Sequence, residues 1–479
     1  MCTRLLSRCA AFVLCCVVSL SAAALVPALA VGTIYVDDNC GCPSPDGTPE
    51  CPYCHIQDGI DVAITGDTVV VLPGTYPENL NFLGKGITVT SGEPLDPAVV
   101  DATMINGGGS GTVVTFAAAE GPDSVLQGFT ITNGSGSLNH GAGIYCSGSS
   151  PTITNNIITD NAAGYNDGGG IACTNHSSPL IAANAIVSNT ADHGGGIYCG
   201  NSSAPIITGN LIAGNSIPAS SGGGIYCSSS SPTIAGNTIT DNTAGLGGGG
   251  IYCSSYSSPA LINNVIAHNS ATYFGGGVRC YNNSSPTITN CTVADNTGGG
   301  IATRTNSPLT ITNCIVWDDI AADETSPVDV TYSDTQDPWP GDDNISLDPQ
   351  FVAPASDDYH LGPESPCIEA GLNASAPSDD IDGDPRPWPS EGSADMGADE
   401  WVPCCDIVYE PSLPSTEEVV TFYSCAGAAQ GGSLLVTWDF GDGGTASGDP
   451  ATHQYPMPGM YTVAATVCGK GGLLCGTCT

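Results

Sequence analysis

The sequence predicts an all-β solenoid, in which short strands stack coil upon coil, followed by a smaller β-sandwich. The main observation is a segment, GGGIYC and its variants, that recurs about every 27 residues between roughly residues 140 and 305. Its copies end at a series of cysteines: Cys146, Cys173, Cys199, Cys227, Cys253 and Cys280. A nearly constant period in this range indicates one supersecondary unit stacked on itself. The second observation is that Gly triplets interrupt every unit and no helical hydrophobic period is present, which excludes helices.

Each repeat also carries apolar and Asn positions at fixed distances from a proline. Ten residues after the proline comes an unbroken Asn series: Asn161, Asn189, Asn215, Asn242, Asn269 and Asn296. Short β-branched runs between Gly, Asn, Ser and Pro indicate strands and turns. Side chains alternate across a strand, so we expect the Ile and Cys of Gly-Ile-Tyr-Cys to point inward and the Tyr outward. Coils stacked about 4.8 Å apart then form Ile and Cys columns, and each Asn amide bonds the Asn of the next coil. We expect these Asn residues to adopt left-handed geometry at a bend.

This pattern resembles the right-handed parallel β-helix repeat family, the architecture of pectate lyases and many bacterial surface proteins. The resemblance covers roughly residues 55–320 and implies a right-handed parallel β-helix, the hand that parallel crossovers usually take. It does not fix an activity, because this fold hosts several chemistries. We therefore expect a β-helix over residues 31–325, with a Cys-rich cap at its N-terminal end.

The first thirty residues have the features of a secretory signal peptide. Arg4 and Arg8 precede an apolar stretch, and Ala28-Leu29-Ala30 supplies the small residues of a cleavage site. We expect cleavage after Ala30, with an uncleaved membrane anchor as the alternative. No later apolar segment is long enough to span a membrane. The sequence thus predicts a secreted, extracellular protein, a monomer without membrane insertion, with attachment to the cell surface left open.

Four cysteines cluster after the predicted cleavage site: Cys40, Cys42, Cys51 and Cys54. In an exported protein this spacing favours disulfides that clamp the open end of the solenoid. A zinc site that includes His55 is the alternative. The cysteines of the repeat are different, because inward-facing and stacked thiols behave as small apolar fillers. Stacking in register fits disulfide geometry poorly.

The charge balance is strongly acidic. After cleavage five basic residues stand against 47 acidic ones, a net charge of −42 (5 − 47). This excludes nucleic acid as a partner, since phosphate binding needs Lys and Arg. It favours bound cations, with Ca²⁺ as the natural candidate for carboxylate-rich loops, although a merely solvating acidic surface explains the charge equally well.

Two segments with different composition follow the repeat. Residues 326–402 are rich in Pro and Asp, and Asp348–Leu361 and Asp380–Glu400 resemble the segment that closes many secreted bacterial β-helices. We expect a cap over the last coil. Residues 403–479 contain VTWDFGDGG and a later GMYTV, which resemble the PKD domain, an immunoglobulin-like β-sandwich that serves as an extracellular spacer or adhesive unit.

Three sets of side chains are candidate sites. The first comprises possible metal ligands, namely one column of the repeat and one loop: His140, Asp167 and His193, and Asp380, Asp382 and Asp384. A His-Asp-His column on successive coils suits a transition metal or acid–base chemistry, and alternating carboxylates around Gly383 suit Ca²⁺. The alternatives are solvated turns that tolerate polar residues.

The second set is a candidate catalytic column, Asp241, His268 and Asp295, on three adjacent coils. Carboxylates on alternate coils would lie about 10 Å apart, near the range of inverting glycosidases. An exposed face of mixed polar residues is the alternative. The third set is the outward column Tyr145, Tyr198, Tyr226, Tyr252 and Arg279. Its ring faces suit sugars and its guanidinium suits a uronate, with simple strand preference of Tyr as the alternative.

The sequence therefore predicts a secreted or cell-surface β-helix protein that binds polysaccharide or another cell-surface glycan, or mediates adhesion. The alternative is a polysaccharide lyase or glycoside hydrolase that uses an outer face of the helix. Lyase chemistry of the pectate type needs Arg or Lys, and only Arg279 and Arg304 lie on the regular coils. A structural coat protein is a third interpretation, and whether the protein is an enzyme stays open.

Overall fold

The computed structural model describes residues 32–136, 141–388, 390–402, 407–410, 419–424, 435–448, 450–457, 461–469 and 474–478. The predicted signal peptide and His140 lie outside these residues. The described chain is all-β apart from two short helices, α1 (Ile56–Val62) and α2 (Pro97–Ala102), and one 3-10 turn, η1 (Pro354–Ser356). None of the helices in these residues is long and apolar enough to cross a bilayer.

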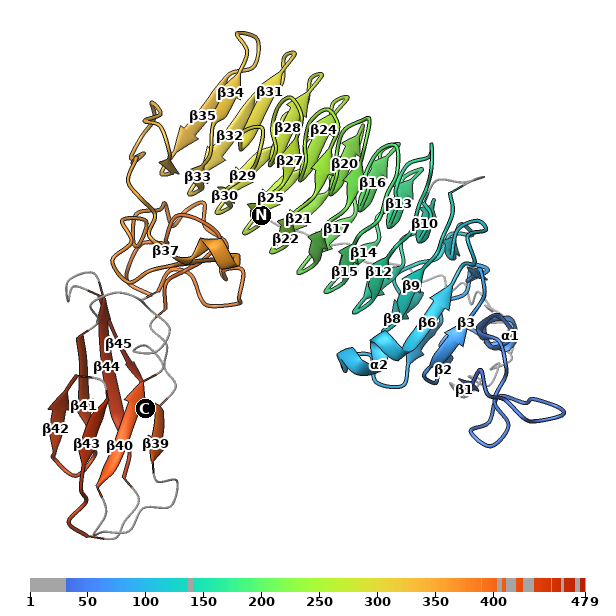
Figure 1. Ribbon diagram of the computed structural model, residues 1–479, viewed down its shortest axis with the longest axis horizontal. Helices are drawn as coiled ribbons and strands as arrows, with labels where there is room; N and C mark the ends of the chain where they lie inside the picture. Colours follow the sequence, from blue (N-terminus) through green and yellow to red (C-terminus); the bar gives the residue numbers. More distant parts are fainter. Residues whose placement is uncertain are drawn as a thin grey trace, which may run out of the picture. The chain divides into compact units, whose positions relative to one another are not determined.

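Three long parallel sheets form the β-helix (Figure 1). Sheet A has twelve strands: β1 (Thr33–Val36), β2 (Thr68–Val71), β5 (Thr88–Ser91), β8 (Val125–Gln127), β11 (Thr152–Thr154), β14 (Leu180–Ala182), β17 (Ile206–Thr208), β21 (Thr233–Ala235), β25 (Ala260–Ile262), β29 (Thr287–Thr289), β32 (Leu309–Thr312) and β35 (Val328–Thr331). Sheet B has eleven: β3 (Gly74–Tyr76), β6 (Thr103–Asn106), β9 (Thr130–Thr132), β12 (Ile157–Thr159), β15 (Ala185–Val187), β18 (Leu211–Ala213), β22 (Thr238–Thr240), β26 (Val265–Ala267), β30 (Thr292–Ala294), β33 (Ile315–Trp317) and β36 (Asp334–Thr335).

Sheet C contains the Gly-Ile-Tyr-Cys segments. Its ten strands are β4 (Leu80–Asn81), β7 (Val114–Phe116), β10 (Ile144–Ser147), β13 (Ile171–Thr174), β16 (Ile197–Gly200), β20 (Ile225–Ser228), β24 (Ile251–Ser254), β28 (Val278–Tyr281), β31 (Ile301–Arg304) and β34 (Ile320–Ala322). A small fourth sheet joins three of the turns: β19 (Ser216–Ile217), β23 (Thr243–Ala244) and β27 (Ser270–Ala271).

The coils stack in register, as the repeat predicts. Ile153 pairs with Ile181, which pairs with Ile207, and all three side chains are completely buried. The six repeat cysteines likewise form one buried column of free thiols, because each cysteine of sheet C pairs with the cysteine of the next coil. The predicted interior columns of Ile and Cys are therefore confirmed.

Buried asparagines tie one coil to the next. The Asn215 side-chain amide donates to Asn242 Oδ1 at 2.9 Å, and the Asn242 amide donates to Asn269 Oδ1 at 2.9 Å. The left-handed residues, however, are those that precede the ladder, such as Asp241 with φ of 54° and His268 with φ of 54°. The expectation that the ladder Asn itself takes this geometry is wrong, since its side chain must point inward to reach the next coil.

The N-terminal end is closed by two disulfides, Cys40–Cys54 and Cys42–Cys51, and by α1. The disulfide interpretation of these four cysteines is confirmed over zinc. Ile56 and Ile60 of α1 are completely buried against the first coil, so the helix covers an edge that would otherwise be open to pairing.

At the other end the parallel sheets continue past residue 325, where the sequence analysis ends the solenoid. Strand β35 pairs with β32, and β36 pairs with β33, so the coils extend to Thr335. Trp339 then packs against the end of the core. Residues 347–402, which we call the closing segment, take a different course from the cap predicted over the last coil.

The closing segment packs along the side of the β-helix, beside β30 and β33 (Figure 1). It contains the antiparallel pair β37 (Phe351–Ala353) and β38 (Asp358–Leu361). Three turn asparagines on successive coils, Asn263, Asn290 and Asn313, donate to its carbonyl groups. The outward residues of sheet B are apolar at this end, for example Val265 and Trp317, and the closing segment packs against them and leaves them half-buried.

The remaining strands form two antiparallel sheets. One contains β39 (Ile407–Glu410), β40 (Val420–Ser424) and β43 (Ala451–His453), and the other contains β42 (Thr445–Ser447), β41 (Leu435–Asp439), β44 (Ala464–Gly469) and β45 (Leu474–Cys478). Trp438, Phe440 and Phe422 form the core between them. The predicted small β-sandwich is confirmed.

Candidate functional site

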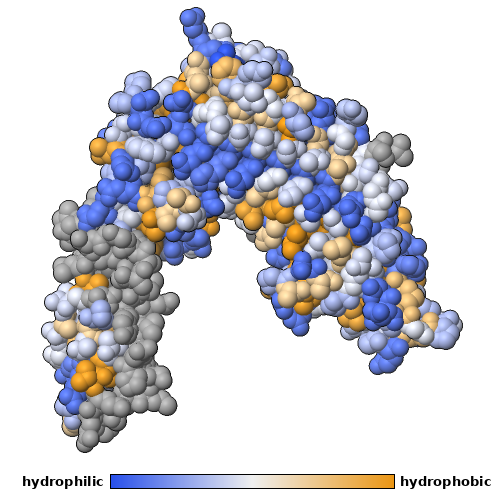
Figure 2. All heavy atoms as spheres, in the orientation of Figure 1, coloured by the Kyte–Doolittle hydropathy of each residue, from blue (hydrophilic) through white to orange (hydrophobic). Residues whose placement is uncertain are grey.

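Two outer faces of the β-helix contain the residues singled out in the sequence. The sheet C face consists of the outward residues of β10 to β31 and of the turns that precede these strands. The sheet B face consists of the outward residues of β18 to β30, and the closing segment lies beside it. Figure 2 shows hydrophobic residues gathered among hydrophilic ones on the surface of the β-helix that is turned to the viewer. Ile206 of β17 and Leu211 of β18 are exposed hydrophobic residues.

The predicted Tyr column lies on the sheet C face. Tyr198 pairs with Tyr226, Tyr226 with Tyr252, and Tyr252 with Arg279 on the next coil. Ring centroids are 5.7 Å apart for Tyr198 and Tyr226 and 5.0 Å apart for Tyr226 and Tyr252. Tyr145 lies on the same face, separated from the others by Ala172 of β13.

The stacking of these rings changes what the column offers to a ligand. Since the strands are about 4.8 Å apart, each ring covers a face of its neighbour, and Tyr252 is only 8% exposed. Burial raises the pKa of the Tyr198 hydroxyl to about 12. The ring faces that Tyr198, Tyr226 and Tyr252 turn toward one another are therefore occupied within the column. What remains for a ligand is a row of ring edges and hydroxyl groups.

The Asp167–His193 pair adjoins the Tyr column. His193 Nδ1 lies 2.8 Å from Asp167 Oδ1, and the His193 ring centroid is 4.8 Å from that of Tyr226. The hydrogen bond to Asp167 raises the pKa of His193 above its ordinary value. Two sets that the sequence analysis treats separately thus share one face. The third predicted member, His140, lies outside the described residues, so a three-ligand metal column stays a prediction.

The column ends in a group of arginines and aromatic rings. The Arg279 guanidinium carbon lies 5.7 Å from the ring centroid of Tyr252, 5.8 Å from that of Phe274 and 5.6 Å from that of Tyr281. The Arg304 guanidinium lies 4.0 Å from the centroid of Phe274. Gly247 makes room for this arrangement, because a Cβ there would meet the Arg279 side chain at 2.4 Å.

These two arginines have no carboxylate partner among the residues that the structure describes, although the chain has a net charge of −40. Arg279 Nε is buried and makes no hydrogen bond to any of the described residues. Phe274 is 37% exposed between the two guanidiniums. Arg304 and Phe274 are not among the site residues predicted from the sequence. The register Tyr281 to Arg304 would place Arg304 one coil beyond, but only the fold shows that both arginines converge on Phe274.

The predicted catalytic column lies at the turn after sheet B. Asp241, His268 and Asp295 have φ between 54° and 57° and follow β22, β26 and β30 on successive coils. The left-handed region favours Asp and Asn among non-glycine residues, so the turn itself explains the acidic residues. Asp241 is exposed, and the structure does not join it to the other two.

The closing segment does connect His268 and Asp295. The Tyr359 hydroxyl donates to Asp295 Oδ2 at 2.8 Å and lies 3.0 Å from His268 Nε2. Asp357 Oδ1 is 3.1 Å from the same His268 nitrogen. Burial raises the pKa of the Tyr359 hydroxyl above its ordinary value. Sequence reasoning could not find Tyr359 and Asp357, because both come from the irregular closing segment.

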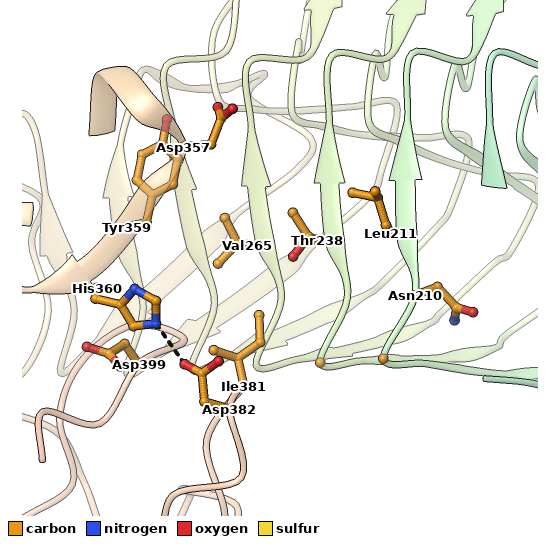
Figure 3. Close-up of a pocket in the computed structure, with 12 residues that line it drawn as sticks. Asn210, Leu211, Thr238, Val265, Asp357, Tyr359, His360, Ile381, Asp382 and Asp399 are labelled. Carbon is orange, nitrogen blue, oxygen red and sulfur yellow. Dashed lines mark hydrogen bonds and ion pairs between the residues drawn. The ribbon is translucent and has the colours of Figure 1, made fainter. Parts of the chain in front are cut away.

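A groove of about 380 Å³ separates this segment from the sheet B face (Figure 3). One wall is formed by outward residues of three coils, namely Leu211, Thr238 and Val265. The opposite wall belongs to the closing segment and is polar: Asp357, Tyr359, His360, Asp382 and Asp399, with Ile381. Pockets of 300–1,000 Å³ with a few convergent polar groups are typical ligand sites.

His360 is the centre of the polar wall. Its Nδ1 lies 2.6 Å from Asp358 Oδ1 and its Nε2 lies 2.8 Å from Asp382 Oδ2. The hydrogen bond to Asp382 raises the pKa of His360 to about 10, and the same bond lowers the pKa of Asp382. Burial raises the pKa of Asp399 to about 7. Ligand atoms of His360, Asp382 and Asp399 all lie within 4.8 Å of one another.

In the predicted calcium loop, the carboxylates of Asp380 and Asp382 have different hydrogen-bond partners. Asp380 Oδ1 accepts from the backbone amides of Asp382 and Asp384 at 2.9 Å and 2.8 Å, and its Oδ2 accepts from that of Glu400. Asp382 turns instead toward His360 (Figure 3). The Asp380 carboxylate thus serves to hold the loop together. Calcium binding by Asp380, Asp382 and Asp384 stays a prediction.

Comparisons with known proteins bear on the fold. A family model described as right handed beta helix region matches residues 86–266 and 170–323, and one described as PKD domain matches residues 403–479. Among solved structures, the chain is similar to the crystal structure of pectate lyase Pel9A. The identity is 14% and the TM-score 0.51, over 78% of this chain and 96% of that one.

At this level of identity the likeness shows the fold alone. No curated protein matches the sequence. The matches to the family models and the observed sheets divide the chain into the same two parts, a parallel β-helix and an antiparallel sandwich. The chain is therefore a right-handed parallel β-helix repeat protein that carries a PKD domain in residues 403–479.

Proposed function

We propose that this is a secreted or cell-surface protein that binds an acidic polysaccharide along the sheet C face. Disulfides and a PKD domain are typical of extracellular proteins, and a parallel β-helix offers a long, regular surface. The observation that carries the proposal is the pair Arg279 and Arg304, which flank the exposed ring of Phe274 without a carboxylate partner among the described residues.

The chemistry of this pair selects an anionic sugar. Guanidinium groups recognise carboxylates and sulfates through paired hydrogen bonds, and the neighbouring aromatic rings hold their planes in place. Four of the basic residues that follow the predicted cleavage site lie in the described part of the chain, and of these Arg386 is buried and Lys85 donates to the carbonyls of Ile60 and Asp61. Among the described residues, a uronate or sulfate therefore finds its strongest partners at Arg279 and Arg304.

The rest of the face suits the neutral part of the chain. The Tyr198 and Tyr226 hydroxyls and the Asp167–His193 pair form a row of hydrogen-bonding groups on adjacent coils. Sugar hydroxyl groups both donate and accept, so a row of mixed donors and acceptors fits them. Phe274 supplies the one ring of the group that is more than a third exposed beside the arginines.

Affinity measurements with two matched polymers test this proposal. Polygalacturonate and its fully methyl-esterified form differ in charge but share a backbone. We expect the acidic polymer to bind more tightly, and Arg279→Gln with Arg304→Gln to reduce its affinity at least tenfold. Lys85→Gln removes the same kind of charge elsewhere and should leave affinity within twofold. Equal binding of both polymers, or an unaffected double variant that is folded by circular dichroism, would overturn the proposal.

A second candidate function is hydrolysis or lyase chemistry in the groove on sheet B. The observation that favours it is the contact of Tyr359 with both His268 and Asp295, because such a cluster can move a proton. Pooled acidic and neutral polysaccharides with Ca²⁺, assayed for new reducing ends and for unsaturated uronate absorbance, test it. Product formation that His268→Ala abolishes would support an enzyme, and absence of product from every polymer would exclude this chemistry for them.

A further inference from the structure

A second site lies in the groove, away from the sheet C face. We propose that His360, Asp382 and Asp399 bind a divalent transition-metal ion, for which Zn²⁺ fits best. The three come from separate places in the chain: β38, the loop after Asp380, and the end of the closing segment. Their ligand atoms nevertheless lie within 4.8 Å of one another on the wall of the groove.

The chemistry of the donors indicates the kind of metal. One imidazole and two carboxylates suit Zn²⁺ better than Ca²⁺, which takes six to eight oxygens. Three protein ligands with one remaining position are typical of zinc sites that also bind a small molecule. His360 and Asp382 are exposed, so both side chains can turn toward a shared ion.

The surroundings of His360 resemble those of a metal-bound imidazole. Asp358 Oδ1 lies 2.6 Å from His360 Nδ1 and fixes the ring with Nε2 toward Asp382. A carboxylate on the far nitrogen is the usual partner of a metal-ligating histidine, because it sets the tautomer and orients the ring. The side chain is thus arranged so that Nε2 is the atom that meets the ion.

Asp399 supplies an independent reason. It is only 8% exposed, and its Oδ2 accepts from the Leu361 amide at 2.7 Å, which holds the carboxylate in place. Buried carboxylates are normally paired or coordinate a metal. Besides His360, the charged groups that act on Asp399 are the carboxylates of Asp380 and Asp382. A divalent cation would balance this local excess of negative charge.

The position of the site indicates what would bind at the fourth coordination position of the ion. The same three residues line the groove, opposite Leu211, Thr238 and Val265 of the sheet B face. An ion held by the polar wall presents its remaining coordination place to the groove. The class of ligand that fits is a small oxygen-bearing group, such as a hydroxyl or carboxylate, with its apolar side on the sheet B wall.

Calorimetric titration of the untagged, chelator-treated full chain with Zn²⁺ alone tests the proposal. We expect one saturable site, at least a hundredfold weaker in His360→Ala, Asp382→Asn and Asp399→Asn. Asp358→Asn should weaken it tenfold to a hundredfold, because this residue only orients His360. Asp384→Asn is the matched control, since it removes a neighbouring carboxylate outside the cluster, and should change affinity less than threefold.

Two further measurements keep the result decisive. Zn²⁺ should raise the thermal unfolding temperature of the wild-type chain and of Asp384→Asn, but not of Asp382→Asn. Co²⁺ should give a visible absorption spectrum that His360→Ala removes. No saturable Zn²⁺ binding, or loss of binding in Asp384→Asn equal to that in Asp382→Asn, would overturn the proposal, the latter in favour of the loop around Gly383. Neither result bears on glycan binding by the sheet C face.

Discussion

The regular coils and the closing segment solve the same problem, the burial of polar groups, in two different ways. In the coils, one Asn ladder repeats a single set of hydrogen bonds from coil to coil, for example Asn215 to Asn242 and Asn242 to Asn269. In the closing segment each contact is made once, as in the Arg386–Glu400 ion pair. Repetition makes the coils predictable, but it lets a residue of an outer column meet only the equivalent residues of the neighbouring coils. The closing segment, in contrast, brings together residues that are far apart in the sequence.

The substitution with the largest expected effect destabilises the closing segment and leaves the coils folded. Arg386 Nε lies 3.0 Å from Glu400 Oε2, and both side chains are buried. Arg386→Met leaves the Glu400 carboxylate without its cation, which costs about 3 to 5 kcal/mol. We expect limited proteolysis to cleave residues 347–402 first, while circular dichroism still shows the β-helix.

The double variant Arg386→Met with Glu400→Gln serves as the control. It removes the charge that the single variant leaves buried, so it should recover part of the lost stability. Equal proteolysis of the single and double variants would show that the ion pair does not hold the closing segment.

A smaller effect breaks the coils instead. Asn242→Ala removes the acceptor for the Asn215 backbone amide and side-chain amide, both buried. Leaving these donors unsatisfied costs about 2 to 4 kcal/mol in the free energy of unfolding, measured by denaturant titration. Thr233→Ala, on the exposed outside of sheet A, should cost less than about 0.5 kcal/mol. If both substitutions cost the same, the ladder is not what joins the coils.

The end of the ladder gives a test that depends on pH. Asp318 stands where the next Asn would be and accepts from the Asn296 side-chain amide at 2.8 Å. Burial raises the pKa of Asp318 from 3.8 to about 6. The pKa of Asp318 is higher in the folded state than in the unfolded state. Its contribution to stability is therefore fully present below about pH 4 and is lost as the pH rises through about 6.

Asp318→Asn should therefore stabilise the protein by about 1 kcal/mol at pH 7 and flatten this part of the pH profile. Thermal unfolding between pH 4 and pH 7 measures both. An unchanged pH profile in the variant would mean that Asp318 does not titrate in this window.

The smallest expected effect concerns the sheet C face. The Asp167 hydrogen bond raises the pKa of His193, so the pair stabilises the folded state fully below about pH 6.5. This contribution is lost as pH rises through the raised folded value. Since the His193 side chain is 34% exposed, the difference should stay under about 1 kcal/mol. The free energy of unfolding of the wild type and of His193→Gln, measured at pH 6 and at pH 9, checks this. We expect the wild type to lose more stability than the variant between pH 6 and pH 9.

The sequence predicts the coils well because their information is local and repeated. The inward Ile153 and Cys146, the outward Tyr198 and the Asn ladder all follow from alternation and a constant period. The Tyr column was located correctly, but its ring faces are covered, because the strand spacing that aligns the rings also stacks them.

The closing segment could not be predicted in the same way, since each of its contacts depends on the tertiary fold. Nothing in the sequence links Tyr359 to His268, or His360 to Asp399. The one available signal is the outward apolar residues Val265, Ile315 and Trp317, which indicate that something covers sheet B at this end. Phe274 and Arg304 were missed because they lie outside the Tyr column itself.

A crystal structure of the protein with a short galacturonate oligomer would show whether the sheet C face binds an acidic glycan. We predict that the oligomer lies on the sheet C face, with a carboxylate within hydrogen-bonding distance of Arg279 and Arg304 and a sugar ring against Phe274. An oligomer bound in the groove beside His360, with the sheet C face empty, would contradict it.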